Sequence, residues 1–305
     1  MVKLDDFLDY LRSEKRSSQH TIDAYSNDLE QFTTWCVREF EIHTPTEISQ
    51  QVVRSWMASL MEEQYEASSV HRKLSSVQAW CRFLMKTGIL THNPARGIPK
   101  PKIAKRLPVF VDEKGAKSLY NKDIYQKNPD NPSEKEIFSA QRDQLIVTLL
   151  YETGIRQAEL LGLKDRDIDD SIGQIKVTGK RNKMRYVPAG RELLDRIRQY
   201  QVSRNRCFDQ NVDGQLFIND TGKKISKTFV YVKVKNYLSQ VSTIKRKSPH
   251  VLRHTFATHM LNNGADLNVI KEVLGHSSLA ATQVYTHNSI EKLKGIHQKM
   301  HPRNN

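Results

Sequence analysis

Apolar side chains recur at helical spacing through the first hundred residues. In four stretches they fall three or four positions apart, which places them on one face of a helix. Ser17 and Ser18 separate the first two stretches, Thr44 begins the third as a capping residue, and Gly88 closes the fourth. We therefore predict four short helices in one bundle, with these positions inside it: Leu4, Phe7, Leu8, Leu11; Ile22, Tyr25, Leu29, Phe32; Ile48, Val52, Trp56, Leu60; and Val70, Leu74, Val77, Cys81.

Residues 93–108, NPARGIPKPKIAKRLP, interrupt this pattern. They hold four prolines and five Lys or Arg residues without one acid. Proline blocks a helix and favours an extended path. We therefore interpret the stretch as a linker between a helical domain at 1–92 and a second domain at 109–305. Two interpretations are open: a solvated hinge, or a hinge that lies along a phosphate backbone.

Beyond the linker, the pattern mixes helices with strands. Residues 138–154 predict an apolar helix, 173–190 predict two short strands around the basic turn GKRNK, and further helices follow from residue 226. Residues 121–136 are polar and rich in turn formers, so we expect a surface loop or a loosely ordered insertion there. The predicted fold class is mostly α with a small β-sheet.

The net charge of +14 points to a polyanionic partner. Nucleic acid fits first and an anionic membrane second, whereas the plain alternative is a charge that only keeps the protein in solution. Residues 1–108 hold 15 basic and 13 acidic side chains, a balance of +2, so most of the excess lies in the linker or beyond it.

The compartment is indicated by the N-terminus and the cysteines. Nothing at the N-terminus resembles a signal peptide, and no apolar run approaches the ~18 residues of a membrane span. Cys36, Cys81 and Cys207 form no CxxC pair, which supports neither a disulfide framework nor a zinc site. We expect buried free thiols in a cytoplasmic protein without a membrane partner.

The stretch SPHVLRHTFATHM, residues 248–260, concentrates groups that suit an anion. A helix that begins at Pro249, capped by Ser248, has unpaired N–H groups and a positive dipole end at its start. It would place His250 and Arg253 three residues apart on one face. The sharper interpretation is one wall of a phosphate site, and the simpler one is a solvated helix face.

Four further positions are candidate site residues, but each one indicates a function only when the four are considered together. The plain alternative for Arg156, which begins a helix after a glycine, is a surface pair with Glu159. Lys180 opens the hairpin turn, where a basic tip is usually solvated. His276 directly follows a glycine at a sharp turn. Tyr285 lies nine residues later, and its plain alternative is a half-buried aromatic.

Together, in the order Arg, Lys, His-x-x-Arg, His and Tyr, these positions resemble the signature of the tyrosine recombinases, also called the phage-integrase family. The matching stretches are TGIRQAELLGL, VTGKRNKMRYVP, SPHVLRHTFATHML and LGHSSLAATQVYTH. The resemblance is closest to the bacterial Xer branch. It covers nearly the whole chain, since TIDAYSNDLEQF and NPARGIPKPK also match. Two departures bear on loop contacts and hairpin flexibility: residues 121–136 look longer than in compact Xer proteins, and Arg181 stands where glycine is common.

The resemblance implies a DNA strand transferase with a role for each site residue. Arg156 and Arg253 would hold the non-bridging phosphate oxygens, because a guanidinium binds phosphate through two donors and stays charged. His276 would add a hydrogen bond to the phosphate, and Lys180 would protonate the leaving 5′-oxygen. His250 would handle the tyrosine proton and help to hold the phosphate. Tyr285 would attack phosphorus to form a 3′-phosphotyrosine.

The implied chemistry requires no metal, cofactor or ATP. The arginines and the lysine would supply the positive charge that a metal provides elsewhere, and the covalent link would conserve the bond energy for rejoining. Glu159 would support the pocket from behind as a hydrogen-bond acceptor. We expect His254 and His259 to be structural.

The resemblance also implies an architecture and partners. A SAM-like four-helix DNA-binding bundle and an α+β catalytic domain would form a C-shaped clamp around double-stranded DNA. Two recombination sites imply four protomers, as a homo- or hetero-tetramer with a related recombinase, and the need for a DNA translocase is open. Residues 289–305 predict an amphipathic helix that would contact the neighbouring subunit, with packing on its own domain as the alternative.

The leading hypothesis is a site-specific recombinase that works through a Holliday junction, in chromosome dimer resolution during cell division. A mobile-element integrase or a DNA invertase would use the same active site. A type IB topoisomerase is disfavoured by the nearly full-length Xer-like pattern, and a non-catalytic DNA-binding protein is disfavoured because all six motif residues are present.

Overall fold

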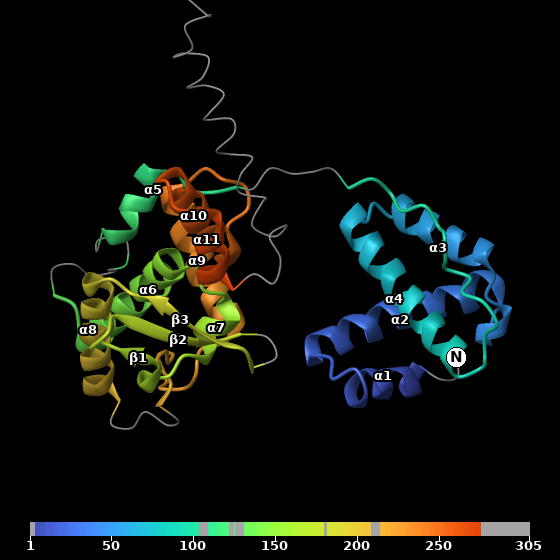
Figure 1. The fold of residues 1–305 in the computed structure, drawn as a ribbon, viewed down its shortest axis with the longest axis horizontal. Coiled ribbons are helices and arrows are strands. Elements are labelled where there is room, and N and C mark those ends of the chain that lie inside the picture. The colour runs from blue at the N-terminus through green and yellow to red at the C-terminus, as the bar shows by residue number, and fades with distance from the viewer. Residues whose placement is uncertain are drawn as a thin grey trace, which may run out of the picture. The chain divides into compact units, whose positions relative to one another are not determined.

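The computed structural model of the chain describes residues 4–103, 109–121, 125, 131–179, 182–208 and 214–275. The chain divides into two compact units, Met1–Arg106 and Leu107–Asn305, which are described in turn (Figure 1). Among the described residues, no helix is long and apolar enough to cross a membrane.

The N-terminal unit contains the four predicted helices: α1 (Leu4–Ser13), α2 (Gln19–Phe40), α3 (Gln50–Glu62) and α4 (Ala67–Lys86). The predicted apolar positions form its core, except that Leu4 and Tyr25 are only partly buried. Ser18 and Ser49 cap α2 and α3 by accepting hydrogen bonds from main-chain N–H groups. Thr44, predicted to begin the third helix, instead precedes the short 3-10 turn η1 (Pro45–Glu47).

A buried carboxylate joins α2 to α4 inside this core. Asp28, 1% exposed, accepts hydrogen bonds from Arg72, from Lys73 at 3.3 Å and from Ser76 at 2.8 Å. A buried charge is costly unless it is paired. The three donors of α4 therefore compensate the charge of Asp28 and fix the register between the two helices.

The first part of the predicted linker packs on the same bundle. Ala95 and Ile98 are buried in the core of the N-terminal unit. Gln78 of α4 donates to the carbonyl of Ala95 at 2.9 Å, and the His71 ring nitrogen lies 2.7 Å from the carbonyl of Pro101. Residues 93–101 are thus attached to α4, while 104–108 lie outside the described residues.

The second unit surrounds a long buried helix, α6 (Glu134–Thr153), and adds a small sheet. The sheet is antiparallel in the order β1 (Ile168–Asp169), β2 (Gln174–Thr178), β3 (Met184–Pro188), with Val177 opposite Arg185. The other elements are α5 (Glu113–Lys117), η2 (Ser118–Tyr120), α7 (Gln157–Gly162), η4 (Asp165–Asp167), α8 (Arg191–Cys207), α9 (Lys227–Val241), α10 (Pro249–Asn262) and α11 (Leu267–Leu274).

Sequence patterns missed several features of this unit. They predicted neither β1 nor α8, although α8 makes extensive contact with α6 (Figure 1). Part of the expected surface loop at 121–136 is also built into the fold. Ser133 and Glu136 form a capping box that starts α6, and the ring of Tyr125 stacks on that of Tyr237 with centroids 5.1 Å apart.

The cysteines are free thiols, as expected. Cys36 and Cys81 are buried in the N-terminal core, and burial raises the pKa of each thiol to about 12. Cys207 is only partly buried, which departs from the prediction.

Candidate active site

Helix α10 begins at Pro249, as predicted, and holds Arg253 in the interior of the second unit. Arg253 is 2% exposed, so it does not lie on a solvated helix face, whereas His250 in the first turn is exposed. Its Nη1 donates to the carbonyl of Gly154 at 2.6 Å and its Nη2 to the carbonyl of Leu274 at 2.7 Å. Because both acceptors are main-chain atoms at helix ends, the guanidinium is held in a fixed position.

A tight turn between α6 and α7 places Arg156 at the end of α11, where Arg253 is also bonded. Gly154 ends α6 with a φ of 60°, and a Cβ on it would lie 2.5 Å from the Phe256 ring and 2.8 Å from Leu274. Only glycine satisfies both the left-handed backbone and the close packing. Two residues later Arg156 occupies the N-cap of α7, where its main-chain N–H donates to Glu159 at 2.7 Å.

Arg156 is more accessible than Arg253. Its side chain is 37% exposed, with Nη1 bonded to Glu159 at 2.9 Å and Nη2 to the carbonyl of Gly275 at 3.1 Å. The predicted pair with Glu159 is therefore real, but it is no surface pair, because Glu159 is only 3% exposed. The guanidinium of Arg156 is thus anchored at two points, while more than a third of the side chain remains exposed.

The end of α11 organises this arrangement. The last carbonyls of a helix lack partners within the helix and form its negative pole. Here three successive carbonyls each accept from a different arginine: Val273 from Arg185 Nε at 2.8 Å, Leu274 from Arg253, and Gly275 from Arg156. Side chains from β3, α10 and the start of α7 thereby converge on one turn of backbone.

Arg185 is a residue of this site that the sequence analysis missed. Its Nη1 and Nη2 donate to the two carboxylate oxygens of Glu159 at 2.8 and 3.0 Å. Burial alone would raise the pKa of Glu159, but hydrogen bonds from Arg185 and from the Arg156 main chain outweigh it and lower that pKa. The available signal was the position of Arg185 in the strand MRYVP, five residues after Lys180 and without a partner close in sequence.

The histidines of α10 divide into two environments. The rings of His250 and His254 lie 4.5 Å apart. His250 is exposed at the start of α10, where partial desolvation, followed by the positive charges of Arg253 and Arg156, lowers its pKa below the ordinary value and favours the neutral imidazole that can accept a proton. Burial, with His250 and Arg253 nearby, lowers the pKa of His254 to about 4. His259 instead bonds the Tyr151 hydroxyl at 3.0 Å in the protein interior, a structural position.

The structure thus brings together Arg156, His250 and Arg253, while Lys180, His276 and Tyr285 lie outside the described residues, as do Arg181 and the C-terminal segment 289–305. The residues that precede two of them are described. Gly179 lies beside Glu159, where an added Cβ would be 3.2 Å from a carboxylate oxygen, and Gly275 ends α11 with a φ of 64°.

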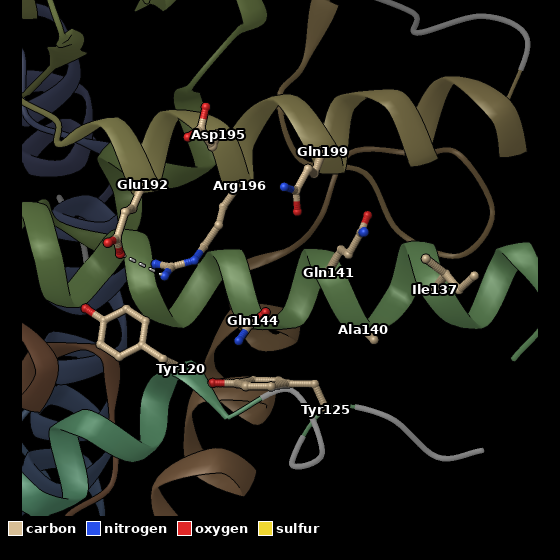
Figure 2. Close-up of a pocket in the computed structure, with 10 residues that line it drawn as sticks. All are labelled: Tyr120, Tyr125, Ile137, Ala140, Gln141, Gln144, Glu192, Asp195, Arg196 and Gln199. Atoms are coloured by element: carbon tan, nitrogen blue, oxygen red, sulfur yellow. Dashed lines mark hydrogen bonds and ion pairs between the residues drawn. The ribbon is translucent and has the colours of Figure 1, made fainter. Parts of the chain in front are cut away.

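A hollow of about 330 Å³ lies apart from these residues, between η2, α6 and α8 (Figure 2). In it the Arg196 guanidinium lies 4.6 Å from the Tyr120 ring centroid and is paired with Glu152 at 3.1 Å and Glu192 at 3.4 Å. Its cation is therefore neutralised locally. None of the predicted site residues that the structure describes lines this hollow.

The fold, a helical bundle followed by a mostly helical domain with a small sheet, matches one class of protein, the DNA strand transferases that act through a tyrosine nucleophile. The chain belongs to the phage integrase family, the tyrosine recombinases. The phage integrase family matches residues 125–292, and the phage integrase N-terminal SAM-like domain matches residues 4–88. The family acts on DNA strands through a tyrosine nucleophile, and this chain is a site-specific recombinase.

Within this family, two relatives that align with nearly the whole chain are both XerC recombinases. The tyrosine recombinase XerC of Chlorobaculum parvum is 34% identical over 317 residues, covering 98% of this chain and 94% of the relative. The tyrosine recombinase XerC of Halalkalibacterium halodurans is 37% identical over 302 residues, covering 97% and 96%.

Solved structures agree with the fold. The crystal structure of XerA recombinase is 26% identical, covers 98% of both chains and gives a TM-score of 0.53. XerH recombinase, in a post-cleavage complex with a palindromic difH substrate, gives a TM-score of 0.77 and covers 97% of this chain and 83% of its own. At 19% identity, the XerH likeness shows the fold alone.

Proposed function

We propose that this recombinase resolves chromosome dimers during cell division, cutting and rejoining each strand through a covalent bond between Tyr285 and the 3′-phosphate. The relatives named XerC at 34–37% identity over nearly the full chain support this role. The observation that carries the chemistry is the convergence of Arg156 and Arg253 on the end of α11, where the charges of both arginines act on His250.

The proposed cleavage step assigns one task to each group. The phenolic oxygen of Tyr285 attacks phosphorus and gives its proton to His250. The P–O bond to the 5′-oxygen breaks, and Lys180 protonates that oxygen as it leaves. The negative charge that builds up on the non-bridging oxygens is stabilised by hydrogen-bond donors, which are most effective where they need no reorganisation during the reaction. The donors to this phosphate are Arg156, Arg253 and His276.

We propose that the two units divide the work. Residues 1–92 bind DNA as the SAM-like bundle, residues 109–305 carry out the chemistry, and 93–108 join them. The attachment of 93–101 to α4 suggests that this half of the linker moves with the bundle. The partner is a double-stranded recombination site in the cytoplasm, near the nucleoid. Four protomers, all alike or shared with a related recombinase, exchange strands through a Holliday junction.

A nicked suicide substrate tests the chemistry, because loss of the short cleaved fragment traps the covalent intermediate. Wild-type protein should form an adduct resistant to denaturant, and Tyr285→Phe should form none while binding the same DNA with unchanged affinity. Equal adduct formation by both proteins would remove Tyr285 as the nucleophile. Loss of DNA binding by Tyr285→Phe would indicate a folding defect, in which case the conservative Arg156→Lys variant supplies the test.

Genome-wide mapping of bound DNA tests the biological role. Dimer resolution predicts one dominant peak near the replication terminus. A dominant peak at the boundary of a mobile element would instead identify an integrase, and one at an inverted repeat flanking an invertible segment would identify an invertase.

A further inference from the structure

Arg185 connects three parts of the candidate site that are far apart in the sequence. From β3 it reaches both carboxylate oxygens of Glu159 in α7 and the carbonyl of Val273 in α11. Its side chain is 16% exposed and packs under Gly275, where an added Cβ would lie 3.2 Å from the guanidinium carbon. This fork-to-carboxylate geometry is the most directional ion pair that proteins use.

We propose that Arg185 is a positioning residue of the active site: it neutralises Glu159 so that the exposed part of Arg156 stays available for the substrate phosphate. Arg185 also ties the strand that follows the GKRNK turn to the end of α11, immediately before His276. This inference deepens the proposed function, since it rests on Arg156 as a phosphate ligand.

Hydrogen bonding around Glu159 carries the inference. The two oxygens of this carboxylate accept four donors: the main-chain N–H and Nη1 of Arg156, and Nη1 and Nη2 of Arg185. One carboxylate between two guanidinium groups leaves a net charge of +1 beside the site. Without Arg185, Arg156 is the one cation among the described residues that still pairs with this buried carboxylate, and the net charge of the remaining pair is zero.

Because an uncompensated buried charge is costly, the removal of Arg185 should draw Arg156 more tightly onto Glu159. Arg156 would then be less able to hold phosphate. Misplacement of a catalytic group by about 1 Å can lower a rate on the order of a hundredfold. The defect should therefore appear in the rate of bond cleavage and not in the affinity for DNA.

Charge removal at Glu159 separates this role from a merely structural one. In Arg185→Gln, single-turnover adduct formation on the suicide substrate at saturating protein should slow on the order of tenfold or more. If the unbalanced carboxylate causes the defect, the double variant Arg185→Gln with Glu159→Gln should cleave faster than Arg185→Gln alone. If Arg185 only fills space, the second substitution should leave the rate unchanged or lower it, and the proposal fails.

Controls complete the experiment. Arg198→Gln makes the same chemical change on the exposed face of α8, where the Arg198 side chain is 57% exposed, and should leave the cleavage rate at the wild-type value. Arg185→Lys keeps the positive charge but loses the two-point contact with the carboxylate. Its cleavage rate should lie between those of wild type and Arg185→Gln. A wild-type rate in Arg185→Gln would overturn the inference, whereas absence of adduct from wild-type protein would overturn the proposed function itself. Should Arg185→Gln fail to fold, the comparison of Arg185→Lys with and without Glu159→Gln decides.

Discussion

The guanidinium of Arg253 is bonded to the main-chain carbonyl of Leu274 at 2.7 Å, so one buried side chain joins α10 to the last turn of α11. A second donor of Arg253 satisfies Gly154 at the end of α6. A residue that holds two helix ends inside the protein should matter for stability as well as for catalysis.

Replacing Arg253 by lysine should separate these two contributions. A single ammonium group on a shorter reach cannot serve both carbonyls, and leaving one unsatisfied costs about 1–3 kcal/mol. We expect Arg253→Lys to lower the stability of the second unit by that amount and to reduce cleavage. Chemical denaturation followed by circular dichroism measures the loss, with the exposed Arg198→Lys as the matched control. Equal stability of the two variants would contradict the structural role of Arg253.

Gly154→Ala should be among the most damaging small substitutions in the second unit. The left-handed backbone at φ 60° penalises any Cβ, and this Cβ would also meet the Phe256 ring at 2.5 Å. We expect a loss of at least ~2 kcal/mol, the sum of backbone strain and overpacking. Gly264→Ala isolates the backbone strain, because Gly264 has a φ of 86° but no atom lies within 4 Å of the added Cβ. A smaller loss at Gly154 than at Gly264 would refute the packing argument.

His254 should make the second unit sensitive to acid. Its pKa in the folded protein is about 4, below the ordinary value of 6.5, so the unfolded chain takes up a proton first as the pH falls. Stability contributed by the neutral ring is therefore complete above pH 6.5 and declines between pH 6.5 and about 4. Because the ring is only partly buried, we expect the decline to be on the order of 1–2 kcal/mol.

Thermal denaturation of wild type and His254→Gln across this pH range measures the effect. The variant should show a shallower loss of stability below pH 6.5, although His250, whose pKa is also lowered, should retain part of the slope. Parallel curves for the two proteins would assign the acid sensitivity to other groups.

Asp28→Asn should destabilise the N-terminal unit. The substitution leaves Lys73, 7% exposed, without its carboxylate inside the protein, and breaking a buried pair typically costs about 3–5 kcal/mol. Tryptophan fluorescence reports this unit alone, because Trp35, Trp56 and Trp80 are the three tryptophans of the chain. The matched control is Asp9→Asn, whose pair with Arg12 is exposed and should contribute less than ~1 kcal/mol.

Sequence patterns that span only a few residues predicted many of the helices and strands of this protein. The spacing of apolar side chains identified the four N-terminal helices, because one buried face must recur with the helical period whatever lies against it. The same local logic predicted the hairpin of β2 and β3 and the start of α10 at Pro249. The ordered motifs identified the family, and the comparisons confirmed it.

Contacts between distant segments determined the rest. That Arg253 is buried, that Glu159 is an interior carboxylate shared by two arginines, and that Arg185 belongs to the site all depend on where α7, β3, α10 and α11 meet. An arginine in a strand has the same local pattern whether its partner is water or a carboxylate 26 residues away. Side-chain type and spacing therefore specify the chemistry available to the chain, while the desolvation and pairing that tune this chemistry arise only when the fold closes around it.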